Sequence, residues 1–136
     1  MKTKITTFFI YAAIITIVAC SATTAHIDEA RVCTSVADNQ CPTDNPVLGT
    51  STPEIFVSCQ LKNAPENTDV NFAWVYLGQQ KIAIDNVTLN SGSNIGTVNM
   101  QSSLSRPTNG WPPGDYEVII SIVGFDKDVV KSFSIQ

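Results

Sequence analysis

Alternation between apolar and polar residues through the middle of the chain constrains the fold more than any other feature of the sequence. From Ile55 to Leu61 every second residue is isoleucine, valine, cysteine or leucine, and from Val70 to Tyr76 every second residue is valine, phenylalanine, tryptophan or tyrosine. A period of two is that of a β-strand, whose successive side chains point to opposite faces. No segment after residue 30 has a long period of 3.6 residues, so the sequence predicts an all-β fold.

Short strands separated by turn residues are expected along the whole of this region. The expected strands are residues 31–36, 55–61, 70–77, 81–89, 96–104, 116–123 and 129–135. Residues 38–53 are expected to form a long connection rich in Asn, Asp, Pro, Thr and Ser, and residues 106–115 a structured loop with three prolines and two glycines. Frequent turns between about seven strands indicate an antiparallel sandwich.

Two aromatic residues refine this architecture. Trp74 lies in the third expected strand, where an immunoglobulin-type sandwich commonly places its core tryptophan. Tyr116 opens the penultimate strand, in the position of a tyrosine corner, whose hydroxyl bonds to the backbone. Together the two residues favour an immunoglobulin-like or fibronectin type III-like topology.

The first twenty residues have the pattern of an export signal. Lys2 and Lys4 precede an uncharged stretch from Ile5 to Ala19, which is shorter than the ~20 residues that a membrane-spanning helix needs. Ile17–Cys20 resembles the lipobox of bacterial lipoproteins, with an aliphatic residue three positions before the cysteine and a small residue directly before it. Two or more acyl chains on Cys20 would anchor the protein stably to a leaflet.

The chain is therefore expected to comprise a lipoprotein signal peptide (1–19), a lipidated tether (20–29) and one immunoglobulin-like β-sandwich (30–136). In this scheme the protein is anchored in the cell envelope, and Ser21 resembles outer-membrane sorting if the source is Gram-negative. Two alternatives stay open for the N-terminus: an ordinary secretory signal cleaved after Ala25, and an uncleaved anchor helix.

Three cysteines remain after Cys20, an odd number for an oxidising compartment. A Cys33–Cys41 disulfide is favoured, because the Asp38-Asn39-Gln40 segment between the two cysteines is a natural turn. The pairings Cys33–Cys59 and Cys41–Cys59 stay open. Cys59 is in phase with the apolar residues of its strand, which predicts a core position.

Charge and composition argue against several classes of function. The formal net charge is −4, from eight basic and twelve acidic residues, and removal of Lys2 and Lys4 with the signal leaves six basic residues and a charge of −6. An acidic chain is a poor match for nucleic acid and for anionic lipid headgroups. His26 is the only histidine, and no metal site, cofactor or catalytic constellation is expected.

Several segments resemble small bacterial surface lipoproteins with a single immunoglobulin-like domain. These segments are Trp74, Ser103–Pro107, Gly110–Val118 and Phe133–Ile135, and the third contains a loop of the form Trp-Pro-x-Gly-x-Tyr that leads into a strand. The resemblance covers most of residues 30–136 and concerns the fold. It implies no functional residues.

The loop before Tyr116 is the candidate binding surface. Arg106, Asn109 and Trp111 lie in it, at an end of the expected sandwich, where loops commonly bind partners. Tryptophan is also frequent at binding hot spots. For Trp111 itself the favoured interpretation is that the ring folds back and closes the bottom of the core, and binding is the alternative.

These features predict a non-enzymatic, lipid-anchored binding module of the bacterial cell envelope. Contact with the membrane is expected through the lipid anchor, and the expected partner is a protein or, as second choice, a glycan. Two other functions stay open: a structural accessory subunit of an envelope complex, and a surface inhibitor or exclusion factor.

Overall fold

The computed structural model describes residues 24–136, so the lipobox and Cys20 lie outside the described residues. Within residues 24–136 the chain forms strands and no helix, which confirms the all-β prediction. The strands are β1 (His26–Cys33), β2 (Val47–Leu48), β3 (Glu54–Ala64), β4 (Asp69–Leu77), β5 (Lys81–Asn90), β6 (Gly96–Ser105), β7 (Gly114–Ile122) and β8 (Asp128–Ile135). In this part of the chain, no helix is long and apolar enough to cross a membrane.

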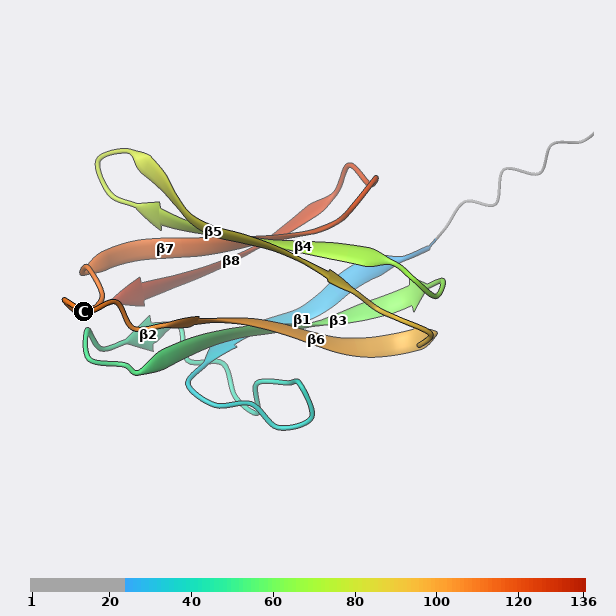
Figure 1. Cartoon of the computed structure of the whole chain (residues 1–136), viewed down its shortest axis with the longest axis horizontal. Helices are drawn as coiled ribbons and strands as arrows, with labels where there is room; N and C mark the ends of the chain where they lie inside the picture. The colour runs from blue at the N-terminus through green and yellow to red at the C-terminus, as the bar shows by residue number, and fades with distance from the viewer. Residues whose placement is uncertain (1–23) are drawn as a thin grey trace, which may run out of the picture.

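The strands form two sheets that face each other (Figure 1). One sheet has the order β1-β3-β6, and the other has the order β2-β8-β7-β4-β5. The pairing of β2 with β8 is parallel, whereas all other strand pairings are antiparallel. Because the chain changes sheet between β3 and β4, between β5 and β6, and between β6 and β7, the core lies between elements that are distant in sequence.

The predicted alternation fills this core. Every second residue from Ile55 to Leu61 on β3, and from Val70 to Trp74 on β4, is buried. The Trp74 ring packs edge to face on Phe133 of β8 with 6.2 Å between centroids, and its Nε1 donates a hydrogen bond to Ser102 Oγ of β6 at 3.1 Å. Trp74 therefore links the two sheets, as expected of a core tryptophan.

The first strand begins at His26, earlier than the domain boundary expected at residue 30. The prediction that residues 26–29 belong to a tether was therefore wrong. His26 pairs with Lys62 of β3, and the register shifts after Asp28, where Glu29 has a φ of 53°. This half of β1 is specified by backbone pairing along a sheet border, and such a strand accepts polar side chains without any alternation.

The long connection expected over residues 38–53 also contains a strand. Val47 of β2 pairs with Ser134, and Leu48 pairs with Ile135. Two residues cannot display a period of two, so the sequence carries no signal for β2. The parallel pairing of β2 with β8 joins segments that are distant in the sequence, so local sequence patterns do not predict it.

Apart from the connection that follows β1, the loops gather at two ends of the domain (Figure 1). The proximal end, where the chain enters β1, is formed by residues 24–26, 65–68, 91–95 and 123–127. The distal end is formed by residues 49–53, 78–80 and 106–113 and by the C-terminus. The two ends have different surfaces, since, among the described residues, large apolar side chains are exposed in the proximal loops and not in the distal ones.

Candidate functional site

The distal loop 106–113 contains Trp111, the residue of greatest interest in the sequence. Trp111 is only 4% exposed and belongs to the hydrophobic core. Its Nε1 donates to Thr52 O at 2.7 Å, and its ring meets Tyr116 edge to face with 6.4 Å between centroids. The buried ring is not available to a partner, so the structure agrees with the favoured interpretation, in which Trp111 closes the core, and argues against the alternative of a binding hot spot.

The neighbours of Trp111 in this loop lie at the surface. Arg106 and Asn109 are exposed. The Arg106 guanidinium donates to Ser51 O at 3.0 Å, and the backbone N–H of Trp111 donates to Thr50 O at 3.1 Å. These bonds fasten the loop to residues 49–53, so the candidate binding loop has a structural part in sealing the distal end.

Tyr116 holds the start of β7 against this loop. The residue is 2% exposed, and its hydroxyl donates to Pro112 O at 2.6 Å, which confirms the predicted contact between the hydroxyl and the backbone. The ring stacks on Phe133 with 5.2 Å between centroids. Burial, with a smaller contribution from Tyr76, raises the pKa of Tyr116 to about 12, so the hydroxyl stays protonated and keeps its donor role at neutral pH.

Replacing Tyr116 with phenylalanine is expected to lower the free energy of unfolding by about 0.5–1.5 kcal/mol, because the ring stays and only the hydroxyl bond is lost. Urea unfolding measures the change. Tyr76→Phe is the matched control, because the Tyr76 hydroxyl donates to Pro113 O at 2.9 Å at an exposed position. Equal effects of the two variants would contradict a special role for the buried hydroxyl.

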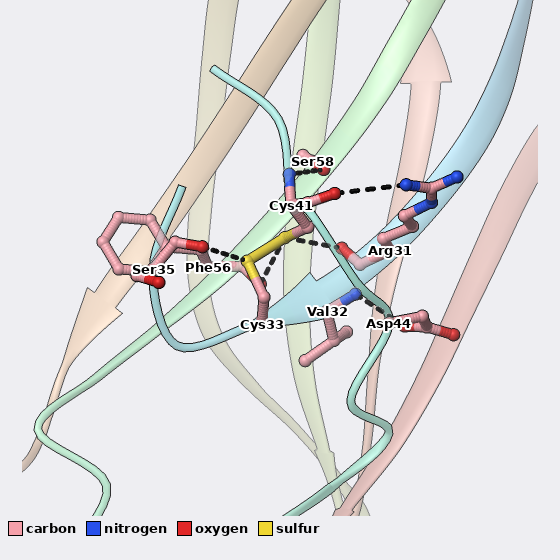
Figure 2. The surroundings of a disulfide bond; sticks show 8 residues. All are labelled: Arg31, Val32, Cys33, Ser35, Cys41, Asp44, Phe56 and Ser58. Carbon is pink, nitrogen blue, oxygen red and sulfur yellow. Dashed lines mark hydrogen bonds between the residues drawn. A yellow bond between two sulfur atoms is a disulfide. The ribbon is translucent and has the colours of Figure 1, made fainter. Parts of the chain in front are cut away.

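A disulfide joins Cys33 and Cys41, with the two Cα atoms 5.6 Å apart (Figure 2). Cys59 is a buried free thiol. This is the pairing that the turn between the two cysteines favours. Ser58 Oγ accepts a hydrogen bond from the backbone N–H of Cys41 at 2.8 Å. Ser58 alternates with core residues of β3, so the disulfide loop covers the outer face of the three-stranded sheet.

The connection after Cys41 is fastened to both sheets. Asp44 accepts a hydrogen bond from the backbone N–H of Val32 at 2.9 Å, and its second oxygen lies 2.6 Å from Lys131 Nζ on β8. Desolvation would raise the pKa of Asp44, but the Lys131 ammonium and the Val32 N–H together outweigh it and lower the pKa. The disulfide region therefore acts as a clamp whose stabilising ion pair is complete at neutral pH and is lost as the pH falls through the lowered pKa of Asp44.

Removing the disulfide with the double substitution Cys33→Ser and Cys41→Ser should lower the free energy of unfolding by about 2–3 kcal/mol, because the unfolded chain regains the freedom of the short loop. Urea unfolding of the wild type with and without a reductant should show the same loss. The double variant is the control, since a reductant should leave it unchanged. A wild type that is insensitive to the reductant would contradict the prediction.

The proximal end exposes large apolar side chains in its loops. Ile95 is 73% exposed, Val123 is 55% exposed and Phe125 is 37% exposed. The distal loops of the described chain expose no large apolar side chain. Phe125 also lines two depressions of about 540 and 370 Å³, one beside residues 24–27 and the other beside residues 65–69.

The proximal loops are held together by backbone hydrogen bonds. Asn67 N–H donates to Gly92 O at 2.7 Å, and Ser91 N–H donates to Thr68 O at 2.9 Å, which joins the β3–β4 loop to the β5–β6 loop. Val123 N–H donates to Asp69 O at 3.0 Å and fixes the start of the β7–β8 loop. The exposed apolar side chains therefore stand on a preorganised frame.

The border strand β5 offers a second exposed surface. β5 pairs with β4 alone, and it exposes Ile82 (54%) and Ile84 (41%). A register shift leaves Ile84 without a partner residue on β4. A border strand presents unpaired backbone N–H and C=O groups, so it can accept a strand from another protein, although a bulge of this kind restricts how far such pairing extends.

The described residues offer little reactive chemistry. Within residues 24–136, no three His, Cys, Asp or Glu side chains gather in a way that could hold a metal ion. Burial raises the pKa of the Cys59 thiol to about 12, and a thiol of that pKa is protonated and unreactive at neutral pH. The candidate sites are the exposed apolar surfaces at the proximal end and along β5.

Comparison with known proteins assigns no family to the chain. No protein-family model and no curated protein matches it. Among solved structures, it is similar to the Pseudomonas fluorescens alkylpurine DNA glycosylase AlkC bound to DNA containing an abasic site analog, with 15% sequence identity and a TM-score of 0.49. The likeness covers 82% of this chain and 30% of the glycosylase chain, and we draw nothing about this chain from a likeness at that level.

Proposed function

We propose that the protein is a non-enzymatic, lipid-anchored binding module of the bacterial cell envelope, and that a partner protein docks along β5. The observation that carries the proposal is the border position of β5 together with the exposure of Ile82 and Ile84. In docking of this mode, main-chain hydrogen bonds supply affinity and pockets for alternate side chains supply specificity. The isoleucines would be the apolar anchors of such an interface.

An immunoglobulin-like topology is part of the proposal. In immunoglobulin domains, strands A, B and E share one sheet, and strands C, F and G share the other. The order β1-β3-β6 corresponds to A-B-E, and the order β8-β7-β4-β5 corresponds to G-F-C followed by an added strand C′. The hydrogen bond from the Tyr116 hydroxyl to Pro112, a few residues upstream, is what a tyrosine corner requires and supports the same assignment.

Lipidation at Cys20 rests on the Ile17–Cys20 pattern. Metabolic labelling of an expressing bacterium with a fatty-acid analogue is expected to tag the wild type and to leave Cys20→Ala untagged, because the thiol is the attachment point. Equal labelling of the two proteins, or a mature N-terminus at His26, would overturn the anchor.

Site-specific crosslinking in the intact envelope tests the docking surface. A photoreactive residue at position 84 of β5 should capture a defined protein, whereas one at position 97 should not. Thr97 is exposed on β6, which borders the other sheet, and is therefore the matched control. Ile82→Glu should abolish capture from position 84 without changing the melting temperature, since exposed substitutions rarely alter stability by more than about 0.5 kcal/mol.

The stoichiometry of the captured complex separates the three functions. A binding module is expected to give partial capture that depends on conditions, and a permanent accessory subunit would give a one-to-one complex after detergent extraction. An inhibitor or exclusion factor would instead lower the activity of the captured protein. Identical capture from positions 84 and 97 would remove β5 as the docking strand.

A further inference from the structure

We propose that the proximal end of the domain lies against the lipid bilayer, with Ile95, Val123 and Phe125 inserted into its interfacial region. The proposal rests on the lipid anchor at Cys20 that forms part of the proposed function. It assigns the bilayer surface itself to an apolar patch that residues 24–136 leave exposed. In this arrangement β5 stays free for a protein partner.

The linker between Cys20 and the first strand is short. Because β1 begins at His26 and not at residue 30, the chain from Cys20 to His26 extends at most about 20 Å at ~3.3–3.6 Å per residue. His26 lies at the proximal end. The proximal loops are therefore confined to the neighbourhood of the headgroups, whereas the distal end is separated from them by the length of the strands, which reach 11 residues in β3.

The exposed apolar side chains are distributed unevenly between the two ends. All three large apolar side chains that are exposed in loops of the described chain lie at the proximal end. Ile95 extends from the β5–β6 loop, and Val123 and Phe125 extend from the β7–β8 loop. Aliphatic and aromatic groups of this kind gain free energy when they leave water for the headgroup and acyl boundary.

Charge and rigidity define how the contact works. The proximal loops carry acidic Glu66 and Asp126, with Lys127 as their one lysine, so attraction to anionic headgroups does not drive the contact. The apolar side chains are already positioned by the hydrogen bonds that join the proximal loops, so little conformational entropy is lost on insertion. Insertion should therefore be insensitive to salt and effective on neutral phosphatidylcholine.

Tryptophan fluorescence in the full lipidated protein tests this orientation. The protein is reconstituted into phosphatidylcholine vesicles with brominated or unbrominated acyl chains, and Phe125→Trp is compared with Asn109→Trp at the distal end. Trp74 and Trp111 are buried and common to both variants. The added tryptophan of Phe125→Trp is expected to shift to shorter wavelength and to lose fluorescence in brominated vesicles, whereas that of Asn109→Trp should keep its fluorescence.

Two further measurements separate the possible outcomes. Adding Val123→Asp to Phe125→Trp should abolish the quenching while the protein still floats with the vesicles. Protein that floats with equal quenching at both ends, or with none at either end, would overturn the orientation and leave the anchor intact. Protein that does not float with the vesicles would overturn the anchor and, with it, the orientation.

Discussion

Replacing Trp111 with alanine should lower the free energy of unfolding by about 3–5 kcal/mol, the usual cost of deleting a buried tryptophan. The indole closes the distal end of the core beside Tyr116. Its loss also leaves Thr52 O without the hydrogen bond from Nε1 at 2.7 Å. Folded domains of ordinary size are stable by about 5–15 kcal/mol, so this loss is a large share of the stability of the domain.

The neighbouring residue provides a sharp control for that measurement. Asn109 is exposed in the same loop, and Asn109→Ala should change the free energy of unfolding by less than about 0.5 kcal/mol. Denaturant unfolding of both variants, with the slope of the transition compared, distinguishes loss of stability from a change in the unfolded state. If Trp111→Ala lowered the free energy of unfolding by less than about 1 kcal/mol, the ring would have to be exposed, and the binding interpretation would be favoured again.

A loss of about 3–5 kcal/mol is also expected for Trp74→Ala, at the centre of the domain. The side chain is 1% exposed, packs on Phe133 and bonds to Ser102 across the two sheets. Removing it opens a cavity between the sheets, which the surrounding strands can fill only in part. The variant should also lose the near-ultraviolet circular dichroism of the packed core, because that signal depends on tertiary packing.

Ser102→Ala separates the hydrogen bond of Trp74 from its packing. This substitution keeps the ring and leaves its buried N–H unsatisfied, which typically costs about 1–3 kcal/mol. The alanine variant of Trp74 should therefore be clearly less stable than the alanine variant of Ser102. The reverse order would mean that packing of the indole contributes less than the bond that orients it.

Features encoded by neighbouring residues were predictable. The alternation around Ile55 and Val70 identified the two central strands and the core position of Cys59, because a half-buried strand must alternate. The Cys33–Cys41 pairing followed from the turn between the two cysteines. The Tyr116 hydroxyl bond was predictable because its acceptor, Pro112, lies only four residues upstream.

Features encoded by distant residues were not predictable. The first half of β1 forms because β3 offers it a backbone partner, and the mostly polar segment from His26 to Glu29 carries no sequence signal for that pairing. The hydrogen bonds that hold Trp111 in the core go to the carbonyl groups of Thr50 and Thr52, which only the tertiary fold brings beside it. The apolar patch of the proximal end likewise combines side chains from two separate loops, and isolated exposed residues such as Ile95 have no pattern in the sequence.

Cys59 and the Cys33–Cys41 disulfide lie on opposite faces of one sheet, so the disulfide can rearrange only in a molecule that has unfolded. Cys59 points into the core, whereas the Cys33–Cys41 bridge lies on the outer face above Ser58. Thiol–disulfide exchange requires a thiolate to reach a sulfur of the bridge, and in the folded domain the intervening sheet prevents that encounter. A Cys59-linked isomer in an aged sample therefore marks a molecule that has unfolded at least once, and the rate at which such isomers accumulate sets a lower limit on the rate of unfolding.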